Sequence, residues 1–122
     1  MIYVAGSSKS KEKIFEVCQL LKKEGFEVYY PFEFESCSEE IVTRDIKAIW
    51  KCSALVRLVD DNNSEGAPHE AQEAKLCNIP VILLNLTGKV LDPWTKFYSD
   101  VEVTSLNDLL NVIKRRKENL KE

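Results

Sequence analysis

Short apolar runs rich in β-branched and aromatic residues alternate along the chain with longer segments of helical periodicity. The runs predict strands at residues 2–5, 27–30, 54–59, 80–84 and 101–104. The segments between them predict helices at residues 11–24, 39–51 and 68–78, and a last helix capped by Ser105. This alternation predicts the α/β class: a doubly wound three-layer domain with a five-stranded, mostly parallel sheet, flavodoxin-like or Rossmann-like.

Length and composition fit one ordinary globular domain covering residues 1–122, with 44% hydrophobic and 30% charged residues. A net charge of -3 argues against a nucleic-acid-binding surface, which is normally basic. No apolar run approaches the roughly 20 residues that span a bilayer, so we expect no membrane partner. The connection 85–100 is long and aromatic, which favours a functional flap with a short helix.

The four cysteines show no C-x-x-C spacing, and no export signal is recognisable, so we expect reduced thiols and a cytoplasmic protein. Cys18 and Cys77 fall at apolar helical positions and are expected to be buried, while Cys37 and Cys52 carry no further prediction. His69 is the only histidine. We therefore expect no metal and no other cofactor.

The stretch from Ser64 to Glu70 follows the strand at 54–59 and opens a helix, which places it at the carboxyl edge of the sheet, where open α/β sheets bind ligands. Pro68 suits the first helical position, which would put Glu70 in the first turn. The free N–H groups and dipole there favour an ionised carboxylate. Glu70 is then either a nucleophile or a simple helix cap.

Two acids fall on inward faces of their predicted helices. In the helix 39–51, Asp45 lies within the apolar half of the helical wheel, whose other members are Ile41, Val42, Ile46, Ile49 and Trp50. Glu70 shares a face with Ala67, Ala74 and Cys77. A carboxylate directed at a core is costly unless it is paired or used. Two such groups at one sheet edge favour glycosyl-bond chemistry, with one acid as nucleophile and the other at the leaving group.

The first strand and the loop after it carry further candidate groups. The hydroxyl of Tyr3 could orient Glu70, although packing in the core is the more common reason for an aromatic residue in a strand. Gly6-Ser7-Ser8-Lys9-Ser10 supplies N–H groups, hydroxyls and a cation at a helix start, which are the parts of an anion site. Simple capping by Ser8 or Ser10 remains the alternative.

Taken together, these residues resemble the nucleoside 2-deoxyribosyltransferase superfamily, most closely its 2'-deoxynucleoside 5'-monophosphate N-hydrolase branch. The resemblance rests on three segments that span most of the chain: Ile2-Tyr3-Val4-Ala5-Gly6-Ser7, Arg44-Asp45 with the residues up to Ala54, and Ser64-x-Gly66-x-x-x-Glu70. It implies cleavage or transfer at the N-glycosidic bond of a nucleoside, with either ribose or 2'-deoxyribose, or of its 5'-monophosphate, through a covalent glycosyl-enzyme. It also implies a homodimer.

The resemblance implies a role for each matching residue. Glu70 would attack C1' of the sugar, Asp45 would assist departure of the base, and Tyr3 would hold Glu70. The 5' end of the substrate would lie against a second group of residues, which consists of Ser7, Lys9, Ser64 and the backbone of Gly6 and Gly66. Lys9 stands where the hydrolases carry arginine, a change that keeps the charge and loses bidentate phosphate recognition.

One position departs from the hydrolase pattern. Asp92 stands where a phosphate-binding serine is expected, in a segment that resembles the part of the hydrolases that reaches into the neighbouring subunit's site. A carboxylate there would repel a phosphate and could instead accept a hydrogen bond from a 5'-hydroxyl. Hydrolysis against transfer, and phosphate against hydroxyl, therefore stay open.

Two alternatives come from other functional classes. The first is a nucleotide-binding or interaction module of the same fold without catalysis. The second is a phospho-receiver domain with Asp60 or Asp61 as acceptor. Receivers need further acids after the first strand, where this chain has Gly6 and Ser7, so the receiver is the weaker alternative.

Overall fold

The computed structural model describes residues 1–33 and 39–120, with side chains up to residue 116. Within them, five parallel strands form one sheet in the order β2-β1-β3-β4-β5. The strands are β1 Ile2–Ala5, β2 Val28–Tyr29, β3 Ala54–Val59, β4 Val81–Asn85 and β5 Val101–Val103. This order is that of the flavodoxin-like doubly wound fold, which confirms the expected fold class.

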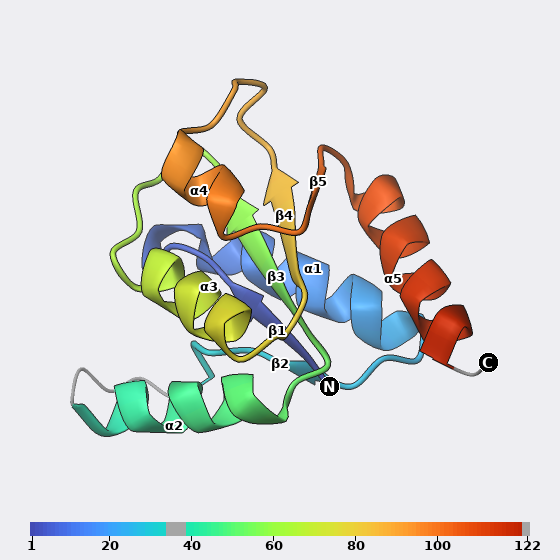
Figure 1. Cartoon of the computed structure of the whole chain (residues 1–122), viewed down its shortest axis with the longest axis horizontal. Coiled ribbons are helices and arrows are strands. Elements are labelled where there is room, and N and C mark those ends of the chain that lie inside the picture. Colours follow the sequence, from blue (N-terminus) through green and yellow to red (C-terminus); the bar gives the residue numbers. More distant parts are fainter. Residues whose placement is uncertain (34–38, 121–122) are drawn as a thin grey trace.

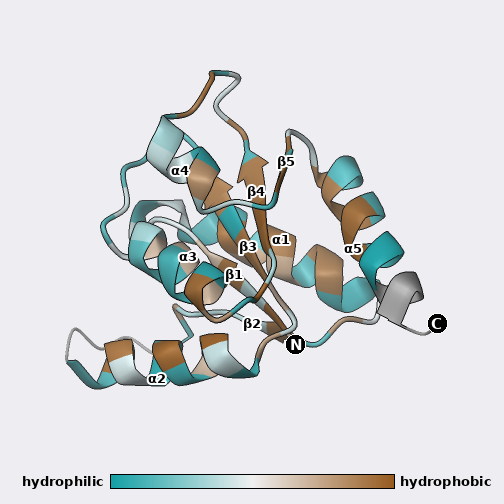
Figure 2. Ribbon diagram, viewed as in Figure 1, coloured by the Kyte–Doolittle hydropathy of each residue, from teal (hydrophilic) through white to brown (hydrophobic). Residues whose placement is uncertain are grey.

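Helices cover both faces of the sheet and produce three layers (Figure 1). They are α1 Lys11–Lys23, α2 Glu39–Lys51, α3 Gly66–Leu76, α4 Pro93–Phe97 and α5 Leu106–Leu120, with a 3-10 turn η1 at Ser8–Ser10. α1 and α5 pack on one face in an aliphatic core, and α2 and α3 pack on the other. The strands β1, β3 and β4 consist mainly of buried hydrophobic residues, as expected for parallel strands covered on both sides (Figure 2).

The registers bring the strand ends to one edge. Tyr3 pairs with Tyr29 of β2 and with Leu55 of β3, while Ala5 pairs with Arg57. The loops after β1 and β3 therefore meet above the carboxyl edge of the sheet, together with the amino end of α3. This edge is the one at which the sequence predicts the site.

The helix α3 begins two residues before Pro68, so the predicted start at Pro68 is wrong. The hydroxyl of Ser64 accepts a hydrogen bond from the N–H of Ala67 at 3.0 Å and so satisfies a free donor of the first turn. Pro68 is tolerated within that turn because an N–H there has no intrahelical acceptor. As a result Glu70 lies in the second turn and not in the first.

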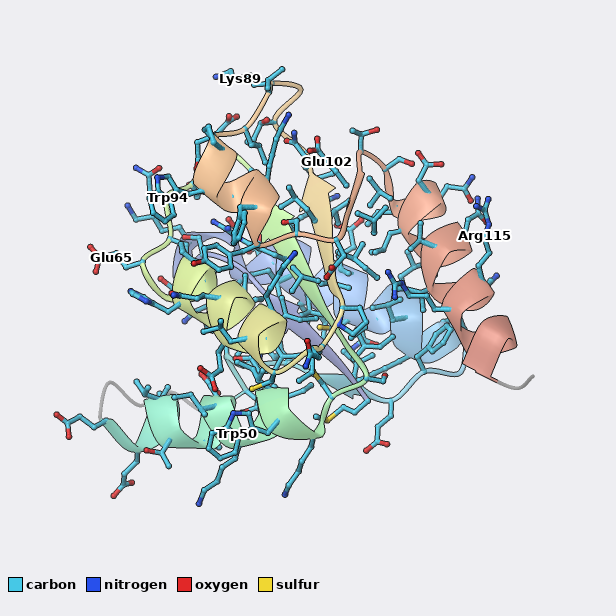
Figure 3. The ribbon with its side chains drawn as sticks, in the orientation of Figure 1. Trp50, Glu65, Lys89, Trp94, Glu102 and Arg115 are labelled. Carbon is cyan, nitrogen blue, oxygen red and sulfur yellow. The ribbon has the colours of Figure 1, made fainter. Side chains whose placement is uncertain are left out.

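Burial differs from the expectation for two groups of residues. Cys18 is buried as predicted, but Cys77 lies just beyond α3 and is exposed, since the helix ends at Leu76. The prediction for Cys37 lies outside the described residues. On α2, Ile49 is fully buried, whereas Val42 and Trp50 are more than half exposed (Figure 3). The rest of the protein therefore covers only part of the apolar half of α2.

No helix in the described ranges has both the length and the apolar character needed to cross a membrane.

Candidate active site

Glu70 reaches back from α3 to the sheet, where the hydroxyl of Tyr3 donates a hydrogen bond to its Oε2 atom. Tyr3 is fully buried in β1. Burial and the neighbouring Glu70 charge raise the pKa of Tyr3, so the phenol stays protonated and acts as the donor. The contact expected between these two side chains is present, although the catalytic roles assigned to them stay predictions.

Burial also raises the pKa of Glu70 to about 7. The hydrogen bond from Tyr3 and the charge of Arg57 lower it, while the charge of Asp45 raises it. The dipole of α3 was expected to keep this carboxylate ionised. The dipole acts most strongly in the first turn, and Glu70 lies beyond that turn, so the effect of desolvation on the pKa outweighs that of the dipole. At neutral pH the carboxyl group therefore divides between its two protonation states.

Asp45 is held by residues from β2 and from its own helix. The hydroxyl of Tyr29 donates to its Oδ1 at 2.8 Å, and Nη2 of Arg44 lies 3.6 Å from the same oxygen. Arg44 Nε in turn donates to the Tyr29 hydroxyl at 3.0 Å. Burial raises the pKa of Asp45, and both Tyr29 and Arg44 oppose that rise.

A tyrosine pair joins the two acids across the strands β1 and β2. The rings of Tyr3 and Tyr29 stack with centroids 5.0 Å apart and an interplanar angle of 23°. One hydroxyl of the pair serves Glu70 and the other serves Asp45. The stacked rings thus fix the donors of both carboxylates relative to one another.

Both acids open into one pocket of about 450 Å³ between α2 and α3. Its volume lies in the range of small-molecule sites. Gly66, His69 and Gln72 contribute polar lining, and the walls are otherwise mainly aliphatic: Val42, Ile46, Ile49 and Leu76. Two carboxyl groups at the mouth of a partly apolar pocket could serve a flat heterocycle attached to a polar ring.

The loop after β1 is tightly tied to the loop after β3. The hydroxyl of Ser7 donates to the carbonyl of Asn63 at 2.8 Å and accepts from the N–H of Lys9 at 3.1 Å. Gly6 is required by packing, since a Cβ there would lie 2.7 Å from Ile14 Cδ1. Lys9 is exposed. The loop is therefore well ordered, and part of its hydrogen-bonding capacity is already used within the chain.

Ser64 and Asp92 line a second pocket, of about 280 Å³, at the ends of β3 and α3. Asp92 caps α4, accepting hydrogen bonds from the N–H and the hydroxyl of Thr95 at 2.9 and 2.7 Å. These bonds lower the pKa of Asp92. Of the predicted residues, Asp45, Glu70 and Gly66 line the first pocket, where Tyr3 contacts Glu70, and Ser64 and Asp92 line the second. Gly6, Ser7 and Lys9 are not among the residues that line either pocket.

Tyr29 and Arg57 were not among the site residues predicted from the sequence. Tyr29 lies in a strand, where an aromatic residue gives no functional signal. Arg57 is 9% exposed and lies inside the apolar run of β3. Asp45 was singled out because it is a charged residue on an apolar face. Arg57 is likewise a charged residue within an apolar run, so the same criterion applied to the strand 54–59 would have identified it.

In the described part of the chain, no group of three or more His, Cys, Asp or Glu side chains could hold a metal ion.

Two solved structures share this fold over nearly their whole length. The 2-deoxyribosyltransferase from the psychrotolerant bacterium Bacillus psychrosaccharolyticus has a TM-score of 0.78 and 21% identity, with 88% of each chain covered. The CMP N-glycosidase BcmB of Clostridium botulinum has a TM-score of 0.68 and 18% identity, with 93% of this chain and 97% of that chain covered. The fold implied by the sequence resemblance is confirmed.

Comparison with curated protein sequences finds no match. Residues 2–83, which run from β1 into β4 and include Tyr3, Asp45 and Glu70, match the family described as Domain of unknown function (DUF4406). Because the match covers more than half of the 122 residues, the chain belongs to that family.

Proposed function

We propose that this protein is an enzyme that cleaves or transfers the N-glycosidic bond of a nucleoside or its 5'-monophosphate, with 2'-deoxyribosyl substrates as the leading candidates. The observation that carries the proposal is the contact between Tyr3 and Glu70 beside a pocket that Asp45 also lines. The likeness of the fold to a 2-deoxyribosyltransferase and a CMP N-glycosidase supports it.

In the proposed first step a carboxylate oxygen of Glu70 forms a bond to C1' of the sugar, and the bond from C1' to the base nitrogen breaks. The base leaves with the bonding electrons and takes up one proton. Asp45 is suited to deliver that proton, because burial raises its pKa. Tyr3 orients Glu70 and keeps one of its two oxygens occupied, which directs the other at the sugar.

In the second step water or a second base attacks C1', and the ester bond to Glu70 breaks. Asp45, now ionised, accepts the proton that the attacking water or the N–H of the attacking base releases. With water the product is the free sugar, and with a base it is a new nucleoside. Partial exposure of the pocket between α2 and α3 is compatible with either acceptor.

For the 5' end of the substrate we retain the residues that the resemblance indicates. Ser64 Oγ accepts from the Ala67 N–H and keeps its own proton to donate, and Lys9 is exposed and cationic. Ser7 and the backbone of Gly6 and Gly66 complete this proposed contact. Asp92 is proposed to accept a hydrogen bond from a 5'-hydroxyl.

Replacement of Glu70 by Gln tests the reaction. The purified protein is incubated with common deoxynucleosides and their monophosphates, with and without a free base as acceptor, and products are separated by chromatography. We expect base release by the wild type and a loss of at least about a thousandfold in Glu70→Gln, as for a missing nucleophile. Mass spectrometry of the wild type should find a deoxyribosyl adduct on the peptide that contains Glu70.

The matched control is Glu65→Gln, the same change at an exposed side chain that points into solvent before α3 (Figure 3). It should retain wild-type activity. Base release that survives unchanged in Glu70→Gln would contradict the mechanism. Binding of a monophosphate without base release from any substrate would favour the non-catalytic nucleotide-binding alternative.

We also propose that the active form is a homodimer. The segment between β4 and β5 exposes large apolar side chains, with Val90 85%, Trp94 75% and Phe97 66% exposed. Figure 1 shows this segment projecting beyond the carboxyl edge of the sheet. Light scattering should give twice the mass of the 14.0 kDa chain, and Val90→Lys should lower the dimer fraction. A monomeric wild type at assay concentrations would refute this assembly.

A further inference from the structure

Arg57 is a buried cation without a bonded partner among the residues that the structure describes. Its side chain lies on the same face of β3 as Leu55, beneath α3, and the residue is 9% exposed. Its Nε atom is buried and makes no hydrogen bond. Asp92 and Glu70 influence its pKa through their charges, but neither carboxylate lies within 4.0 Å of the guanidinium in the described ranges.

A guanidinium cannot escape burial by losing its proton. Burial lowers the pKa of Arg57, yet an arginine stays charged at neutral pH. A buried charge is normally paired and hydrogen-bonded, because desolvation is costly. This one therefore keeps an unbonded Nε donor and a full positive charge that no carboxylate of the described residues pairs.

The two acids that line the second pocket together with Arg57 already accept other hydrogen bonds. Both oxygens of Asp92 are bound by Thr95. Asp60 Oδ1 accepts from the hydroxyl of Ser10 and from the N–H of Asn62, each at 2.9 Å. Neither acid forms the two-pronged pairing that a guanidinium makes with a carboxylate.

Arg57 opens into the 280 Å³ pocket between β3, α3 and α4. Ser64, whose hydroxyl keeps its own proton to donate, and Asn63 also line this pocket. The volume is just below the roughly 300 Å³ at which pockets accept whole small molecules. It fits one oxyanion group with a few attached atoms.

We propose that Arg57, together with Ser64, binds the phosphate or carboxylate group of a small ligand in this pocket. The site differs from the pocket of Asp45 and Glu70, and its existence requires no assumption about glycosidic chemistry. It adds Arg57 of β3 to Ser64, which the proposed function already assigns to the 5' end of the substrate. The carboxylates of Asp60 and Asp92 line the same pocket and oppose an anion by their charge, so binding has to rest on direct contact with Arg57.

The test titrates inorganic phosphate and 2-deoxyribose 5-phosphate into the whole protein at pH 7, with 2-deoxyribose as the uncharged probe. The Arg57 Nε–H resonance is followed by NMR and affinity by calorimetry. We expect the resonance to move with either phosphate and not with 2-deoxyribose. Affinity should fall about tenfold or more in Arg57→Gln, and less in Arg57→Lys, which keeps the charge without the fork.

The control is Arg115→Gln, which removes an exposed arginine on α5, remote from the pocket (Figure 3). It should bind phosphate as the wild type does. If Arg57→Gln does not fold, the wild-type resonance and Arg57→Lys carry the test. Equal affinity in Arg57→Gln and wild type, or an Arg57 resonance that phosphate leaves unmoved, would overturn the proposal.

The two phosphate probes separate the sources of the anion. Binding of 2-deoxyribose 5-phosphate at least tenfold tighter than inorganic phosphate supports a site for one end of a substrate. Equal affinities support a site for the free anion. Since binding is measured without turnover, an inactive Glu70→Gln variant that still binds phosphate through Arg57 would leave this site intact even if the proposed reaction failed.

Discussion

The face of the sheet beneath α1 and α5 buries aliphatic side chains, whereas the face beneath α2 and α3 buries Tyr3 and Arg57 as well. On the first face, β1 and β3 contribute Ile2, Val4, Val56 and similar residues. Successive residues of a strand point to opposite faces, so the same strands serve both. One face of the sheet therefore packs in an aliphatic core, and the other carries the polar side chains of the candidate site. We call the face beneath α1 and α5 the aliphatic face and the face beneath α2 and α3 the chemical face.

The helices on the two faces of the sheet pack through side chains of different size. α3 packs on the sheet through small residues, namely Ala67, Ala71 and Ala74. Small side chains bring the helix backbone close to the sheet and leave volume for the phenol of Tyr3 and the carboxylate of Glu70. α1 instead contributes large aliphatic side chains, including Ile14 and Leu21. The chemical face thus has less apolar area to bury and more polar groups to satisfy.

The largest expected effect on the free energy of unfolding comes from a substitution on the aliphatic face. Ile82 is fully buried in β4 among the residues under α1 and α5. Ile82→Ala should lower the free energy of unfolding by about 3 kcal/mol, from lost transfer energy and the cavity left behind. Urea denaturation measures this loss. If the faces act separately, the Glu70 titration in the folded variant stays at its wild-type position, and a shifted titration would contradict the separation.

A smaller effect comes from the protonation of Glu70. Its pKa rises from 4.5 to about 7 in the fold, so between these values the folded chain holds a proton that the unfolded chain has lost. This contribution to stability is full below about pH 4.5 and is lost as the pH rises through about 7. Glu70→Gln should remove that part of the slope.

The measurement is a series of denaturant titrations from pH 4 to 8 for both proteins. The difference between wild type and Glu70→Gln isolates Glu70 from the other acids, among them Asp45. A difference that stays constant across this range would show that Glu70 has an ordinary pKa in the folded chain.

The smallest expected effect on stability concerns the hydrogen bond from Tyr3 to Glu70 on the chemical face. Tyr3→Phe removes one hydroxyl and should cost about 1 kcal/mol. Because the Tyr3 hydrogen bond lowers the pKa of Glu70, the variant should titrate Glu70 above about 7. NMR of carboxyl-labelled glutamate measures this shift. Tyr29→Phe is the matched control, since its hydroxyl serves Asp45 and should leave Glu70 nearly unmoved.

Periodicity was enough to predict most of the fold. The strands at 2–5 and 54–59 and the helix at 39–51 have the predicted bounds, because each lies between clear breaks such as Gly6 and Ser53. The start of α3 was predicted wrongly from Pro68, because proline is also tolerated later in the first turn of a helix. The helix begins earlier, at Gly66, where the hydroxyl of Ser64 accepts a hydrogen bond from the N–H of Ala67. Local signals specify a helix more reliably than its first residue.

The candidate site was predictable where a polar residue conflicted with its surroundings. Asp45 lies on an apolar helical face, and that conflict was visible in the sequence. The contact between Tyr3 and Glu70 joins residues 67 positions apart and depends on the pairing of β1 with β3, which no local pattern contains. Exposure of Val42 and Trp50 likewise depends on how far the neighbouring helix extends.

The two outer strands are the shortest of the sheet, with two residues in β2 and three in β5. A strand of this length offers few unpaired backbone groups to an approaching chain, which protects against edge-to-edge aggregation. Copies of this protein therefore cannot readily join by extending the sheet from one molecule into the next. Any assembly has to be built from side-chain surfaces of helices and loops, which a point mutation can weaken without unravelling the strands.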